Sequence, residues 1–179
     1  MWSDVYDVAL VNAEGNGNIP ARYQDRYQNG SYEVVLVFCD TERKPYEQYD
    51  DIKRKINDFH GVDNAADEVV ILGNPCTLQI ISKHWTSDTI KKATKAANAP
   101  LIEKFTGVKG YKGRADQIDK VMESINTYNY VNMRERVLKL SRDDHMNGSS
   151  NFCHLVQELE TSETQWMTRI NSILEGDEG

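Results

Sequence analysis

The sequence has few cysteines and no long apolar run. Its three thiols, Cys39, Cys76 and Cys153, are widely spaced and form no CxxC pair, so neither a disulfide framework nor a zinc site is expected. No stretch approaches the ~18 apolar residues of a membrane span. The N-terminus carries acids where a secretory signal needs Lys or Arg. We therefore expect a cytoplasmic protein with reduced thiols and no membrane partner.

Signatures of several enzyme classes are also missing. Gly15 and Gly17 are not followed by Gly-Lys-Ser/Thr, so they form no phosphate loop, and the chain contains no Gly-x-Ser-x-Gly motif. What the chain has is 179 residues with 39% apolar and 9% aromatic side chains. This is enough for one domain with a sizeable core, and it argues against wholesale disorder.

The charge is unevenly distributed along the chain. The formal net charge is −7, but residues 83–120 contain nine Lys/Arg and four Asp/Glu, a local balance of +5. A basic segment of this kind is either a face for an anionic ligand or a solvated helical surface. Under the first interpretation, the candidates for contacts with nucleic-acid phosphates are Lys83, Lys91, Lys92, Lys95, Lys112 and Arg114.

Apolar runs and their spacing predict an α/β fold. Residues 5–11, 33–39 and 68–72 read as strands, the last two apolar enough to be buried on both faces. Residues 19–28 and 45–59 alternate with these runs and read as helices. This order indicates a three- or four-stranded, mainly parallel sheet flanked by helices.

The second half of the sequence reads as helical. Loops are expected at 107–113 and 143–150, and helices are expected at 77–83, 115–125, 131–140, 152–159 and 164–174. We expect an α/β core over residues 1–98 and a helical extension over residues 99–179 that packs on it. The two parts would form a single compact domain.

Acidic side chains follow the first two expected strands. Glu14 comes after residues 5–11, and Asp40 and Glu42 come after residues 33–39. The carboxyl ends of neighbouring parallel strands meet at one sheet edge, and ionised carboxylates that lie close together need a cation. Oxygen ligands at an open edge suit Mg²⁺ or Mn²⁺, which can activate water for phosphodiester cleavage. The alternative is that Asp40 caps the next turn and Glu42 lies in solvent.

The third strand end is followed by Asn74 and, further on, by His84. Asn74-Pro75 fits a helix N-cap and first turn, which would bind a phosphate or simply cap the helix. His84 could transfer protons, although a His beside Trp85 is more typical of a structural role. Tyr128 could stack on bases, but an aromatic residue at helical spacing is more typical of the core.

Three segments resemble one known family. LVNAEGN followed by VLVFCDTE is similar to the paired acidic motifs of Toprim domains, a Glu-Gly after the first strand and an Asp-x-Asp after a later one. ILGNPCTLQIISKHW resembles the Asn-Pro-Cys to His-aromatic segment of RloB-like proteins, which are Toprim-like and linked to phage defence. The resemblance covers residues 5–85.

The resemblance implies a Toprim-like, Rossmann-like core with Glu14 as a metal ligand or acid/base and Asp40 and Glu42 as metal ligands. It implies a magnesium- or manganese-dependent nuclease, or nuclease subunit, of the overcoming-lysogenization-defect type that acts on nucleic acid in phage defence. Glu42 stands where Toprim domains usually have Asp. Because the chain lacks an ATPase motif, a separate ATPase or sensor protein is an expected partner. Assembly of the chain into a homo-oligomer is a further possibility.

Two other functions stay open. A catalytically silent Toprim-like module would bind a protein partner, as a regulatory subunit or a phage-encoded inhibitor does, and the acidic composition and Glu42 favour it. A flavodoxin-like receiver domain would use Asp40 as its phosphoacceptor. That fold needs an acidic pair at its first strand and a Lys after a later strand, and neither stands out here.

Overall fold

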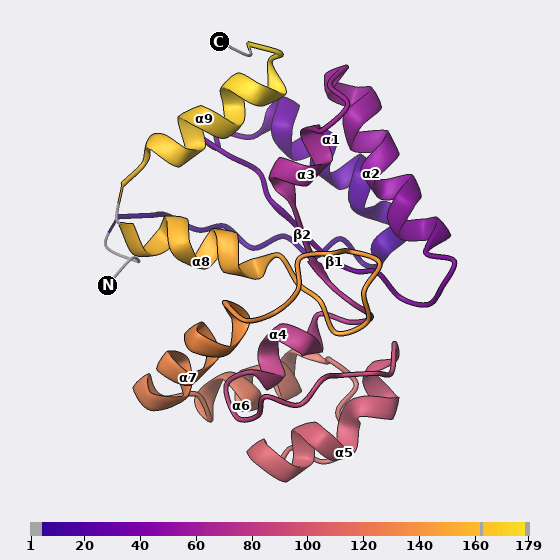
Figure 1. Cartoon of the computed structure of the whole chain (residues 1–179), viewed down its shortest axis with the longest axis vertical. Coiled ribbons are helices and arrows are strands. Elements are labelled where there is room, and N and C mark those ends of the chain that lie inside the picture. Colours follow the sequence, from indigo (N-terminus) through magenta and orange to yellow (C-terminus); the bar gives the residue numbers. More distant parts are fainter. Residues whose placement is uncertain (1–4, 162, 178–179) are drawn as a thin grey trace. The chain divides into compact units, whose positions relative to one another are not determined.

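The computed structural model describes residues 5–161 and 163–177. Helices flank a two-stranded parallel sheet (Figure 1), which confirms the expected α/β class. In chain order the elements are η2 Asn16–Asn18, α1 Ile19–Asn29, β1 Val37–Asp40, α2 Glu47–His60, α3 Ala65–Val69, β2 Val70–Gly73, α4 Leu78–Ser82, α5 Lys95–Thr106, α6 Ala115–Glu123, α7 Thr127–Val137, α8 Phe152–Thr161 and α9 Gln165–Leu174.

The chain folds into two compact units that are interleaved in the sequence. The first comprises Met1–Cys39, Lys44–Ile71 and His154–Gly179, and the second comprises Asp40–Arg43 and Leu72–Cys153. By sequence, the first unit contains seven Lys/Arg and eighteen Asp/Glu, a net charge of −11. The second unit contains fourteen Lys/Arg and ten Asp/Glu, a net charge of +4. The basic segment 83–120 predicted from the sequence therefore lies wholly in the second unit. The boundary expected after residue 98 also falls inside this unit.

In the first unit, α1, α2 and α3 pack together, and α9 contacts α3 (Figure 1). Ile52 and Ile56 of α2 are buried, because a spacing of four residues places both on one face of a helix. Gly61 ends α2 in the left-handed conformation, with φ 68°, and donates its amide to Asn57 O at 2.8 Å. Both helices expected in this part of the sequence are confirmed.

The strand predictions are only partly correct. Residues 5–11 form no strand, so the sheet has two strands in the described part of the chain instead of three or four. Alternating valines favour extended backbone, but a strand forms only where another strand pairs with it, and here the Leu10 side chain is 93% exposed. The third apolar run is divided: Glu68 and Val69 complete α3, and β2 begins at Val70.

An apolar cluster forms the core of the second unit. It joins Leu78 of α4, Ile102 of α5 and Val121 of α6 with Cys76 and Tyr111, which come from the connections between elements. Fully burying an apolar side chain of this size contributes about 1.5–3 kcal/mol. The cluster therefore fixes α5 and α6 against the segment that follows β2.

Candidate functional site

The segment after β1 lies beside the segment after β2 in the second unit. The amides of Thr41 and Glu42 donate to carbonyl oxygens of residues 73–75, at 3.2 and 2.9 Å. Asp40 Oδ1 accepts a hydrogen bond from Thr77 N at 2.7 Å. Because the strands are parallel, both carboxyl ends open at this edge, where ligands of such sheets bind. The acidic segment predicted from the sequence is thus held there by backbone and side-chain hydrogen bonds.

The Cys76 thiol is a second partner of the Asp40 carboxylate. Cys76 is fully buried, and burial, followed by the charge of Asp40, raises the pKa of its thiol to about 11. The thiol therefore keeps its proton at neutral pH and hydrogen-bonds to Asp40. Burial also raises the pKa of Tyr111, with smaller contributions from Cys76 and Asp40. The positive charge of Lys95 lowers the pKa of Cys76, against the larger effect of burial. The groups that bond to the Asp40 carboxylate are therefore the Thr77 amide and the Cys76 thiol.

Sequence reasoning misses Cys76 and Tyr111 as members of this group. One signal points to Cys76: it follows Asn74-Pro75 at a strand end, where functional side chains gather. Tyr111 is the aromatic residue within the glycine-rich basic loop 107–113, and a large ring in such a loop indicates that the loop packs back on the core. Neither signal says that the two side chains share one buried cluster or that Cys76 bonds to Asp40.

The basic loop is fastened beneath Lys95. Gln117 of α6 is 5% exposed; its Oε1 accepts from Lys112 N at 2.7 Å, and its Nε2 donates to Lys109 O at 3.3 Å. Gly113 has φ +75°, and a Cβ added there would lie 3.0 Å from Lys95 Cδ and 3.3 Å from its Nζ. The loop therefore needs glycine at this position both for its backbone conformation and for the close approach of Lys95.

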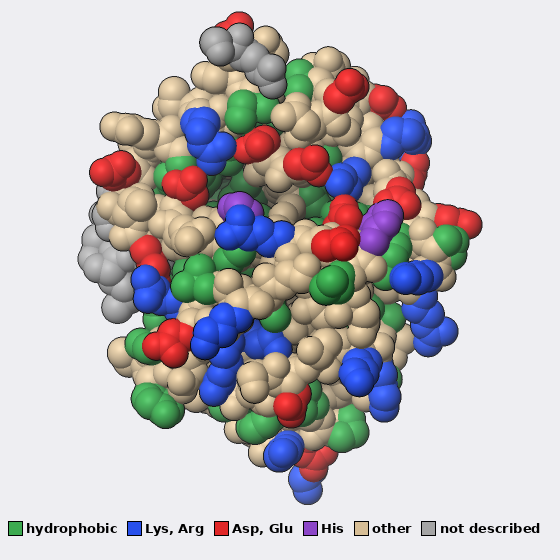
Figure 2. All heavy atoms as spheres, viewed as in Figure 1, with side chains coloured by type: hydrophobic (Ala, Val, Ile, Leu, Met, Phe, Trp, Pro, Cys, Tyr) green, Lys and Arg blue, Asp and Glu red, His purple; other side chains and the backbone are tan. Residues whose placement is uncertain are grey.

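The other basic candidates lie at the surface of the second unit. Lys91, Lys92, Lys112 and Arg114 are exposed, and Arg114 Nε lies 3.3 Å from Asp116 Oδ1. Figure 2 shows Lys and Arg side chains gathered over the area where α4 to α7 lie in Figure 1. Because an exposed ion pair contributes little stability, these cations can exchange solvent or an intramolecular partner for an anionic ligand.

Two of the predicted phosphate contacts do not fit the structure. Lys83 is 1% exposed, and its ammonium donates to Ser87 O at 3.0 Å and to Asp88 O at 2.7 Å. Burial lowers the pKa of Lys83. His84 is half-buried with Nδ1 2.9 Å from Ile81 O, and burial lowers its pKa, so its ring is neutral near pH 7. Both side chains hold the segment after α4 in place.

Asn74 also has a different role from the one predicted. The N-cap of α4 is Thr77, and α4 has only five residues, so the expected phosphate site at a helix N-terminus is not formed. Asn74 instead fastens the loop 143–150. Its amide donates to Ser149 O at 3.1 Å, its side chain donates to Asp144 O at 2.7 Å, and its carbonyl accepts from Gly148 N at 2.9 Å.

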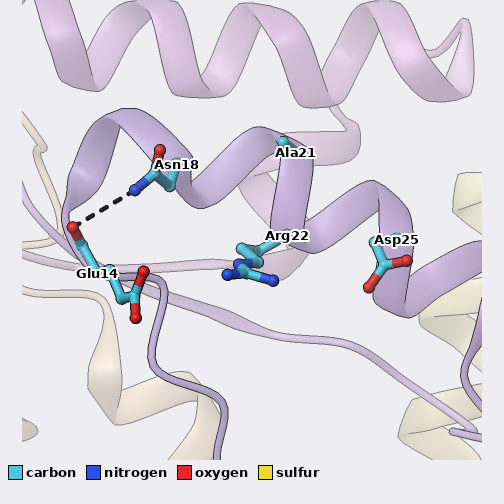
Figure 3. Close-up of a pocket in the computed structure, with 5 residues that line it drawn as sticks. All are labelled: Glu14, Asn18, Ala21, Arg22 and Asp25. Carbon is cyan, nitrogen blue, oxygen red and sulfur yellow. Dashed lines mark hydrogen bonds between the residues drawn. The ribbon is translucent and has the colours of Figure 1, made fainter.

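Glu14 lies in the first unit, beside an open pocket of about 330 Å³ that is also lined by Asn18, Ala21, Arg22 and Asp25 (Figure 3). The Glu14 carbonyl accepts from the Asn18 side chain at 3.4 Å, and the Glu14 amide donates to Asn12 Oδ1 at 2.9 Å. These bonds fix the turn before η2. The Glu14 side chain is exposed.

Two of the predicted acidic residues have strained backbones. Glu14 has φ 60° and Glu42 has φ 62°, a left-handed conformation that costs a non-glycine residue about 1–2 kcal/mol. In the described part of the chain, Tyr46 is the other non-glycine residue with positive φ. Such strain clusters at ligand sites, which favours a functional role for both carboxylates. Since Glu14 belongs to the first unit and Glu42 to the second, their convergence with Asp40 stays a prediction.

Within residues 5–161 and 163–177, no group of three or more His, Cys, Asp or Glu side chains is arranged to hold a metal ion. Asp40 and Glu42 carry two carboxylates, and Mg²⁺ is commonly bound through one or two carboxylates of a protein. No described helix is long and apolar enough to cross a bilayer. No family model, curated protein or solved structure matches the chain.

Proposed function

We propose that the chain is a Toprim-like, metal-dependent nuclease, or nuclease subunit, that hydrolyses nucleic-acid phosphodiesters in phage defence. The observation that carries this proposal is the position of Asp40, the last residue of β1, and of Glu42, two residues beyond it, both held against the segment after β2. In open parallel sheets, ligands bind at this edge. The net charge of +4 on the same unit supports a polyanionic substrate.

The acidic pair fits a hard divalent cation. Mg²⁺ is held by one or two carboxylates and keeps the rest of its coordination shell for water and phosphate oxygens, and Mn²⁺ shares its preference for oxygen. Asp40 and Glu42 would hold the ion. A bound ion would supply an activated water and charge stabilisation at the phosphate.

The protein's own groups orient the acid and hold the substrate. The Thr77 amide fixes Oδ1 of Asp40, and the protonated Cys76 thiol donates to the same carboxylate, so rotation of the Asp40 side chain is restricted. Lys95 places a positive charge near Cys76, where it would neutralise a phosphate that approaches Asp40. Phosphates further along the substrate would meet the exposed residues Lys91, Lys92, Lys112 and Arg114.

The test is to incubate the purified full chain with plasmid, single-stranded DNA and RNA in Mg²⁺ or Mn²⁺. Asp40→Asn and Glu42→Gln should each lower the cleavage rate by about 10²-fold, the loss typical of removing one electrostatic group from an active site. Glu103→Gln is the matched control, because Glu103 is an exposed carboxylate of the same unit. The proposal fails if no cleavage depends on Asp40 or Glu42, even after a candidate ATPase or sensor partner is added.

A catalytically silent module that binds a protein partner is the second candidate. The observation in its favour is that the Asp40 carboxylate already bonds to the Thr77 amide and the Cys76 thiol, which is a structural use of the group. Under this alternative, calorimetric titration with Mg²⁺ gives no heat that depends on Asp40 or Glu42. The wild-type chain and the Asp40→Asn variant then bind the partner equally well.

A further inference from the structure

A row of aromatic rings lies in the second unit, outside the acidic site. The rings of His84 and Trp85 are 5.5 Å apart between centroids, and Trp85 stacks on Phe105 at 6.2 Å with an angle of 11° between the planes. We call these three residues the aromatic row. All three are half-buried, and Lys104 Nζ lies 5.2 Å from the Phe105 centroid. The row therefore combines three half-buried rings with a cation.

Tyr128 lies at the start of α7 and is exposed. It is the second residue of α7, and its neighbour Asn129 donates from Nδ2 to His84 O at 3.5 Å, which brings the start of α7 against the row. The Tyr128 side chain is 74% exposed, so the core role that its helical spacing favours is wrong. A fully solvated phenol contributes little to folding, since the apolar area that it removes from water is small.

The surroundings favour a polyanion with accessible base faces as the ligand. The unit that carries the row and Tyr128 has a net charge of +4, which attracts phosphates and repels cationic partners. Aromatic side chains on a basic surface are the usual platform for single-stranded nucleic acid, because every base has a π face. A duplex hides those faces by stacking its own base pairs.

We propose that Tyr128 and the aromatic row form a stacking surface for the unpaired bases of single-stranded nucleic acid. The identity of the ligand as nucleic acid rests on the proposed function, and the surface narrows the substrate class to unpaired strands. Tyr128 supplies the outermost ring, and Lys104 supplies a positive charge for the backbone of the bound strand.

The experiment measures fluorescence anisotropy of labelled (dT) and (rU) strands of about 15 nucleotides, and of a blunt duplex of equal length, with EDTA present. Tyr128→Ala should weaken single-strand binding by about 5- to 100-fold, the loss typical of removing one stacked base contact. Tyr128→Phe keeps the π face and should bind within about twofold of wild type. Tyr32→Ala is the control, because Tyr32 is a 42% exposed tyrosine of the first unit.

The proposal is overturned if wild type binds no single strand, if Tyr128→Ala binds as wild type does, or if it weakens duplex binding to the same extent. It is also overturned if sedimentation shows a dimer that Tyr128→Ala dissolves, since the surface then belongs to a second copy. EDTA separates this test from the proposed function: Asp40→Asn should bind single strands normally while failing to cleave. If Tyr128→Ala binds single strands as wild type does while cleavage still depends on Asp40 and Glu42, the stacking surface is wrong and the proposed function stands.

Discussion

The clearest consequence of the site geometry concerns Asp40→Ala. The Asp40 carboxylate accepts a hydrogen bond from the partly buried Thr77 amide at 2.7 Å and a second one from the Cys76 thiol. A hydrogen bond to a charged group contributes about 1.5–3 kcal/mol, and a buried donor left without its acceptor costs about 1–3 kcal/mol. Because alanine removes the acceptor of Thr77, we expect the free energy of unfolding to fall by about 2–3 kcal/mol.

Asp40→Asn is the matched variant, since its side-chain oxygen can still accept from Thr77. A neutral hydrogen bond retains about 0.5–1.5 kcal/mol, so the expected loss is about 1 kcal/mol. Urea unfolding gives the free energies, and site-resolved hydrogen exchange at the Thr77 amide reports the bond itself. Exchange at Thr77 should accelerate in the alanine variant and stay close to wild type in the asparagine variant. A loss below about 0.5 kcal/mol in Asp40→Ala, with unchanged exchange at Thr77, would refute the anchoring of Asp40.

Three further predictions concern the loop 107–113 and the half-buried His60. Gln117→Leu removes the acceptor of Lys112 N, so trypsin should cut the loop faster than in wild type; equal rates would contradict the fastening. Gly113→Ala forces a side chain onto φ +75° against Lys95, and should cost about 1–2 kcal/mol of unfolding free energy in urea, whereas no loss would show that the loop adapts freely. Burial lowers the pKa of His60, so the unfolded chain takes up its proton first, and stability should fall as the pH drops below about 6.5. In His60→Gln, the urea midpoint should depend less on pH than in wild type. An equal dependence on pH in both proteins would show that another group causes the loss of stability.

The helices of the first unit are predictable because their signals are local. Pro20 lies in the first turn of α1, and Gly30 caps its end by donating its amide to Arg26 O at 3.0 Å. Ile52 and Ile56 mark the buried face of α2. Each of these features depends on residues within a few positions of one another, so a sequence pattern contains it.

The failures concern contacts between distant residues. Residues 5–11 have the composition of a strand, but a strand forms only if another strand lies close enough to pair with it. A local sequence pattern does not contain that information. Lys83 looks like a surface cation in the sequence, yet two carbonyls after α4 bind its ammonium. The anchor of Asp40 is Thr77, 37 residues away in the chain. The sequence therefore predicts where the acids are, and tertiary packing decides what surrounds them.

Calorimetric titration of the full chain with Mg²⁺ measures whether Asp40 and Glu42 bind a metal ion. We expect wild type to bind the ion, and Glu42→Gln and Asp40→Asn each to weaken binding by about tenfold or more. Exchange at the Thr77 amide should remain protected in Asp40→Asn, which shows that the fold around the site is intact. Binding that is unchanged in both variants, with Thr77 protected, would contradict the assignment of Asp40 and Glu42 as metal ligands.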